Sequence, residues 1–159
     1  MFRRVRLLPI LLLTLLVTSL ASCASAVTVG QHVVVLREPA GFHSRQRMEI
    51  HEAIHKRQYR ERGTLPMVLT YLLSPSRRLK LEAEAYAAEL CYLMRVGDRR
   101  HQAWREGFSI ALRGYSVLGA VSHHRAQAQL AHAYRDGAAC DRLLIEAGRS
   151  SVLAAYPSP

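Results

Sequence analysis

The chain has 159 residues, of which 50% are hydrophobic and 21% charged, and its formal net charge at pH 7 is +10. A chain of this length is expected to form one domain. In a cytosolic protein so basic a charge would suggest nucleic acid as a partner, but the start of this chain indicates export. We therefore expect no nucleic-acid partner.

The first 22 residues have the pattern of a secretory signal peptide. Arg3, Arg4 and Arg6 precede an apolar run over residues 7–17, and small residues follow. The run is shorter than the ~20 apolar residues that a transmembrane helix needs, so a cleaved leader is the better interpretation. The three leader arginines account for three of the +10 charges, which leaves +7 on the mature chain. This basic surface is expected to face anionic lipid or acidic envelope polymers.

The leader ends in LASC (residues 20–23), which resembles a bacterial lipobox. The resemblance implies cleavage before Cys23, lipidation of its thiol and a membrane-anchored tether over residues 23–27. Ala24 stands where an inner-membrane retention signal has Asp, which favours an outer-membrane lipoprotein on the periplasmic side of the envelope. The alternative is cleavage after the ASA motif of residues 24–26, which would remove Cys23 with the leader.

A domain over residues 28–148 is expected to begin with β structure. The β-branched residues of 27–36, followed by a turn signal at 38–41, predict one strand or a small hairpin. Good helix formers between Ser44 and Gly63 predict a helix over 44–62. Residues 63–76 predict a packed connecting loop with one short helix.

Further helices complete the predicted α+β, mostly helical fold, a small bundle behind the hairpin. Residues 77–94 carry apolar and alanine residues on nearly every face, so this helix should be largely buried. Asp98 is a candidate cap for a third helix with a core stripe. Residues 121–147 predict one long helix or two broken near Asp136, and residues 149–159 a frayed tail.

Three cysteines in an exported protein leave one over if two of them pair. With Cys23 lipidated, Cys91 and Cys140 can form a disulfide in an oxidising compartment. The alternative is two buried free thiols.

The motif His51-Glu52-Ala53-Ile54-His55 lies in the first predicted helix. Residues four apart on a helix point the same way, so both imidazoles can reach one metal ion. Neutral imidazole suits Zn²⁺, which would need a third protein ligand. Glu52 lies about 100° round the helix from His51, where it can act as general base toward water activated by the metal.

A carboxylate on the buried second helix is the expected third ligand. Glu82, Glu84 and Glu89 lie on an otherwise apolar element, where a charge is costly unless it is paired or bound to metal. Glu82 and Glu89 share a face, whereas Glu84 lies on another and can pair with Lys80 one turn earlier. Glu82 is therefore the first choice and Glu84 the alternate; a surface ion pair of Glu82 with Arg78 is the competing interpretation.

His51-Glu52-x-x-His55 followed by Glu82-x-x-Ala85-Tyr86 resembles a minimal gluzincin, the thermolysin-like branch of the zincin metallopeptidases. TVGQHVVV, HEAIHKRQY and LEAEAY together resemble small bacterial metallopeptidases of uncharacterised function, over roughly residues 28–95. The resemblance implies a zincin-like fold, a zinc ion, a protein or peptide substrate, and an edge strand over Val33–Leu36 that receives the substrate. Lys56, Arg57 and Tyr86 depart from the usual gluzincin pattern.

Other polar residues are candidates around the motif. Gln58 lies on the ligand face and can bond a residue behind the ligands or the substrate, and Tyr86 is a candidate second-layer residue. Tyr59 and Tyr71 are candidate oxyanion donors. The remaining histidines lack a partner pattern and are expected at the surface.

These patterns leave two classes of function open. The first is a lipid-anchored zinc peptidase. The second is a non-catalytic envelope lipoprotein whose metal site is structural or serves assembly, and the charged flanks of the motif favour it.

Overall fold

The structure is a computed structural model, and it describes residues 26–30, 32–35, 42–114 and 121–148. The expected signal peptide, Cys23 and the tail of residues 149–159 lie outside these ranges. The described elements are β1 (Ala26–Val29), β2 (His32–Val35), α2 (Phe42–Arg62), α3 (Thr64–Leu73), α4 (Pro75–Arg95), α5 (His101–Gly114), α6 (His123–Ala133) and α7 (Gly137–Glu146). The predicted mostly helical α+β class is confirmed.

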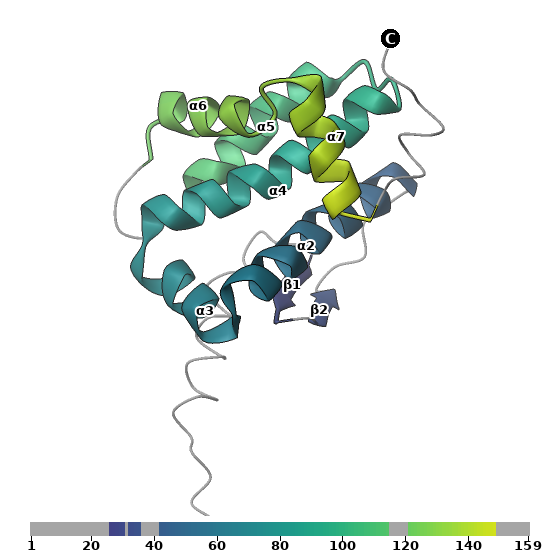
Figure 1. Cartoon of the computed structure of the whole chain (residues 1–159). Coiled ribbons are helices and arrows are strands. Elements are labelled where there is room, and N and C mark those ends of the chain that lie inside the picture. The colour runs from purple at the N-terminus through teal and green to yellow at the C-terminus, as the bar shows by residue number, and fades with distance from the viewer. Residues whose placement is uncertain (1–25, 31, 36–41, 115–120, 149–159) are drawn as a thin grey trace, which may run out of the picture.

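Strands β1 and β2 form an antiparallel hairpin in which Ala26 pairs with Val35 and Val29 with His32. Gly30, in the connection, has a φ of 64°, a left-handed conformation that glycine adopts readily. The first strand, β1, lies against α2 (Figure 1). The edge expected to receive substrate therefore falls on β2, whose outer side carries no further strand among the described residues.

Helix α4 lies at the centre of the bundle and packs against α2, α3, α5, α6 and α7 (Figure 1). Four of its alanines are at most 1% exposed, and such small side chains let the neighbouring helices approach closely; they are Ala83, Ala85, Ala87 and Ala88. Ile54, Leu112, Leu130 and Leu144 fill the space between α4 and its neighbours. Within the described ranges, no helix has the length and apolarity that crossing a membrane requires.

A disulfide joins Cys91 of α4 to Cys140 of α7, with the two Cα atoms 5.3 Å apart. The bond closes a long loop, because the two cysteines are separated by 49 positions. Closing a loop of this length stabilises a fold by about 4 kcal/mol through the entropy of the unfolded chain. The disulfide therefore holds α7 against the central helix.

Some helix boundaries differ from those expected from the sequence. Residues 64–73 form a ten-residue helix instead of a connecting loop with a short helix, because Pro66 lies in the first turn, where its missing N–H breaks no helical hydrogen bond. The third helix begins at His101, since the Asp98 carboxylate caps the backbone N–H of Arg100 in the preceding turn (2.8 Å). Residues 121–147 contain two helices, with the Asp136 side chain capping the start of α7 (2.7 Å to the N–H of Ala139).

Candidate metal centre

Three buried side chains from α2 and α4 converge at the expected motif. The Nε2 atoms of His51 and His55 are 3.0 Å apart. The two oxygens of Glu82 lie 3.5 Å from Nε2 of His51 and 3.6 Å from Nε2 of His55. A tetrahedral zinc ion with bonds of ~2.1 Å would hold its ligand atoms about 3.4 Å apart. The spacing of these three groups therefore fits a single ion of that size.

Hydrogen bonds behind the imidazoles fix which nitrogen faces the centre. Glu89 Oε1 lies 2.8 Å from Nδ1 of His51, and Gln58 Oε1 lies 2.9 Å from Nδ1 of His55. The amide nitrogen of Gln58 donates to the carbonyl of Leu81 and to Glu84 Oε2, so its oxygen must face His55. Both Nδ1 atoms then carry the proton and both Nε2 lone pairs point at Glu82.

The acceptor atoms of the centre face one another. Glu82 Oε1 accepts a hydrogen bond from the Tyr71 hydroxyl (2.7 Å), whereas Glu82 Oε2 is buried and has no hydrogen-bond partner among the described residues. Two imidazole lone pairs and an unbonded carboxylate oxygen facing one another repel unless a cation lies between them. A metal ion or a proton satisfies this arrangement.

The pKa shifts of the three side chains also favour a positive charge at the centre. Burial alone would lower the pKa of His51, but Glu82 and Glu89 outweigh it and raise the pKa well above its ordinary value. Burial likewise opposes protonation of His55, yet the Glu82 carboxylate raises its pKa. For Glu82, burial would raise the pKa, and the two histidines instead hold it far below the usual range. The three groups together favour a bound positive charge.

Glu52 lies beside the ligands without joining them. It is buried on α2, next to His51, and its Oε2 accepts a hydrogen bond from the Thr28 hydroxyl of β1 at 2.5 Å. Its charge contributes to raising the pKa of both histidines, which places the carboxylate near them. The hairpin therefore fixes the side chain that the sequence singled out as a general base.

Glu84 lies apart from the histidines. Its Oε2 is 2.6 Å from Nη2 of Arg57 and also accepts a hydrogen bond from Gln58. The expected pairing of Glu84 with Lys80 is wrong, because Arg57 of the adjacent helix α2 takes that place. Arg78, the competing partner for Glu82, donates to the backbone carbonyl of Tyr71 (3.1 Å).

Aromatic rings support the histidines. Tyr86 meets His51 edge to face with centroids 4.7 Å apart, and its other side stacks on Phe108. Tyr59 lies in a second apolar cluster with Met67 and Leu81. Burial and the charge of Glu52 raise the pKa of the Tyr59 hydroxyl, so it stays protonated.

The structure adds two residues whose part in the centre was not anticipated. The sequence identifies Glu89 as a buried carboxylate, and the structure shows that it orients His51. Its spacing of seven residues from Glu82 places the two carboxylates on the same face of α4. Thr28 had no local signal, because its contact with Glu52 joins residues 24 positions apart. Of the remaining histidines, His32, His124 and His132 are exposed, and His123 pairs with Glu106.

No family model matches this chain, and no curated protein or solved structure matches it either.

Proposed function

We propose that the protein is a zinc-dependent peptidase of the bacterial envelope, with His51, His55 and Glu82 as metal ligands and Glu52 as catalytic base. The observation that carries the proposal is the convergence of three buried ligand atoms within 4.8 Å of one another. Two imidazoles and one carboxylate are a donor set that zinc takes in hydrolytic sites. Zinc, when bound, supplies a Lewis acid that polarises a carbonyl and lowers the pKa of water.

The ligands are held in place by their own neighbours. Glu89 and Gln58 hold the two imidazoles, and Tyr71 holds one oxygen of Glu82. Such contacts behind a ligand fix its orientation and raise its affinity for metal. Glu89, Gln58 and Tyr71 are therefore positioning residues in this proposal.

Glu52 is placed to move a proton. Among the described residues, only Thr28 donates to its carboxylate, and it does so to Oε2. This leaves Oε1 as the atom that we assign to proton transfer: it takes a proton from water during attack on the peptide and returns it to the leaving amine. The hydrogen bond from Thr28 limits the rotation of the carboxylate.

The envelope location and the peptide substrate rest on the start of the chain and on the hairpin. A lipid on Cys23 would tether the domain a few residues from the membrane. Extended peptides bind by adding a strand to an unpaired sheet edge, and the outer edge of β2 carries no strand among the described residues. In this proposal the substrate lies along β2.

A second candidate is a non-catalytic lipoprotein whose zinc site stabilises the fold. The observation that favours it is burial, since the three ligand residues are at most 9% exposed. Structural zinc sites are closed, whereas catalytic ones keep a position open for water and substrate.

Replacement of Glu52 distinguishes the two candidates. The wild-type chain should bind about one zinc ion, as measured by elemental analysis. Glu52→Gln should keep the metal and lower hydrolysis by about a hundredfold or more. Cleavage is followed by mass spectrometry of new termini in envelope protein extracts. Glu61→Gln is the matched control, because it removes a carboxylate from an exposed position of the same helix.

Three outcomes separate the proposals. A wild-type chain that binds no zinc contradicts both. Zinc removal that unfolds the domain, with no new termini from either wild type or variant, supports the structural site and rejects the peptidase. Equal cleavage by the wild type and Glu52→Gln rejects Glu52 as the base.

A further inference from the structure

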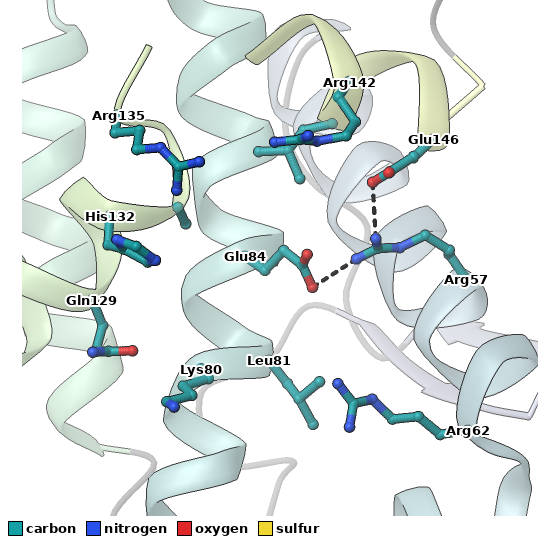
Figure 2. A pocket seen from close by; sticks show the side chains of 12 residues that line it. Arg57, Arg62, Lys80, Leu81, Glu84, Gln129, His132, Arg135, Arg142 and Glu146 are labelled. Atoms are coloured by element: carbon teal, nitrogen blue, oxygen red, sulfur yellow. Dashed lines mark hydrogen bonds and ion pairs between the residues drawn. The ribbon is translucent and has the colours of Figure 1, made fainter. Parts of the chain in front are cut away.

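A second polar site opens on the surface between α2, α4, α6 and α7. It is a pocket of about 530 Å³, and Figure 2 shows its side chains arranged around Glu84 of α4. None of the three candidate metal ligands lines it. Pockets that hold small organic ligands have volumes of ~300–1,000 Å³, so this one is large enough for more than a simple ion.

The lining of the pocket carries an excess of positive charge. Four cations from three helices and one from the connection between α6 and α7 line the pocket together with two carboxylates; the cations are Arg57, Arg62, Lys80, Arg142 and Arg135, and the carboxylates are Glu84 and Glu146. Both carboxylates bind the same cation, Arg57, at 2.6 and 2.9 Å. The two carboxylates of the pocket are therefore both taken up by Arg57 and pair with none of its other cations.

Three of these cations have no ion-pair partner among the described residues: Arg62 of α2, Lys80 of α4 and Arg142 of α7. Arg135 differs, because its Nε lies 3.4 Å from a carboxylate oxygen of Asp136. Unpaired cations that share a pocket repel one another, and an anion bound between them relieves that repulsion. The pocket is therefore built to attract a multiply charged anion.

Phosphate is the anionic group that suits this lining best. Guanidinium groups form paired hydrogen bonds to phosphate oxygens, and a lysine adds a point charge. A phosphate monoester carries close to two negative charges at neutral pH and three terminal oxygens, whereas a carboxylate offers one charge and two oxygens. The charge of three unpaired cations is therefore better balanced by the monoester than by a carboxylate.

We propose that this pocket binds a ligand bearing a phosphate monoester, attracted by the cations Arg62, Lys80 and Arg142 of its lining. Arg57 is not among these cations, because Glu84 and Glu146 pair with it. The phosphate can belong to a soluble compound or to a lipid headgroup, since both present the same terminal group. This proposal does not depend on the zinc site.

The test measures binding of inorganic pyrophosphate to the full chain in non-ionic detergent, and binding of vesicles to the full chain after the detergent has been removed. Pyrophosphate is titrated calorimetrically, and phosphatidylcholine vesicles are compared with vesicles that also contain phosphatidic acid. The double variant Lys80→Gln/Arg142→Gln should bind about tenfold more weakly, because each partly exposed cation contributes a factor of a few. The matched control is Arg105→Gln/Arg113→Gln, which removes the same charge from exposed positions of α5.

A variant of opposite sign completes the test. Glu146→Gln removes a carboxylate from the pocket and leaves Arg57 paired with Glu84, so binding should tighten by a factor of a few because the lining becomes more positive. Pyrophosphate binding that responds to these variants supports a soluble ligand; a response only with phosphatidic acid vesicles supports a lipid headgroup. No binding of either probe, or equal weakening by the α5 control, overturns the proposal.

Discussion

The candidate metal centre and the basic pocket both use residues of α2 and α4, yet they are built in opposite ways. The ligands of the centre are buried, and neighbouring side chains hold both imidazoles and one oxygen of Glu82. The pocket is open, and three of its cations are exposed and without partners among the described residues. A buried site of this kind selects its occupant by geometry, whereas an exposed one selects by charge.

One short chain of hydrogen bonds connects the two regions. Gln58 holds the ligand His55 with its oxygen and Glu84 with its nitrogen, and Glu84 in turn holds Arg57 in the pocket. The comparison can therefore be tested from either side. A substitution of Glu89, which contacts the centre but does not line the pocket, should change metal binding alone. A substitution of Glu84, which joins Gln58 to Arg57, should change metal binding and phosphate binding.

The largest effect is expected from Glu89→Gln, which acts on the centre and on the ion pair of Glu89 with Arg47 but not on the pocket. The amide oxygen can still accept the His51 N–H, but without charge, so zinc affinity should fall by about ten- to a hundredfold. Phosphate binding in the pocket should not change. Zinc affinity is measured by competition with a chelating dye, with the exposed Glu106→Gln as control. Unchanged zinc affinity would reject Glu89 as a positioning residue.

The stability of the metal-free protein should depend on pH through the same centre. Because the pKa of His51 is raised in the folded state, protonation of this side chain stabilises the fold. The contribution is fully present at pH values below the ordinary pKa of 6.5 and is lost as pH rises through the raised pKa. The pKa of Glu82 is lowered, so its contribution to stability has the opposite pH dependence. It is present at pH values above the ordinary pKa of 4.5 and is lost as pH falls through the lowered pKa. The cluster therefore stabilises the metal-free fold most between about 4.5 and 6.5.

Zinc should remove the alkaline part of this dependence, because the ion takes the place of the proton. Thermal midpoints measured against pH, with chelator and with zinc, check this. The chelated protein should lose stability above pH 6.5 and the zinc-loaded protein should not. Identical alkaline profiles with and without zinc would show that the ion does not bind these histidines.

The part of the centre that the sequence predicts is the part set by helix geometry. His51 and His55 are one turn apart, and Gln58 follows on the same face, so their neighbourhood is local. Glu82 was chosen because a buried carboxylate needs a partner, and the structure places it beside both histidines. The hairpin and most helices follow from equally local patterns.

Contacts between distant elements could not be predicted in this way. Arg57 departs from the usual gluzincin pattern, but it lies about 200° round the helix from His55 and pairs with Glu84 and Glu146 across the helix interface. The bond from Thr28 to Glu52 depends on how β1 packs against α2. The basic pocket combines residues of four helices, and no spacing in the sequence relates them.

The smallest effect should come from Glu84→Gln, and it should have opposite signs in the two regions. Gln58 would keep a weaker acceptor, so zinc affinity should fall by only a few-fold, since this contact is one step further from the metal than Glu89. The pocket would lose a negative charge, so pyrophosphate should bind a few-fold more tightly.

Glu146→Gln is the matched comparison for this variant, because Glu146 contacts Arg57 without contacting Gln58 among the described residues. It should tighten pyrophosphate binding and leave zinc affinity unchanged. If Glu84→Gln also leaves zinc affinity unchanged, the hydrogen bonds through Gln58 do not couple the regions. If Glu84→Gln weakens the binding of both zinc and pyrophosphate, the variant has disturbed the packing of α2 on α4 instead. Two sites that share a single link would be established if Glu84→Gln weakens zinc binding and tightens pyrophosphate binding, while Glu146→Gln changes pyrophosphate binding alone.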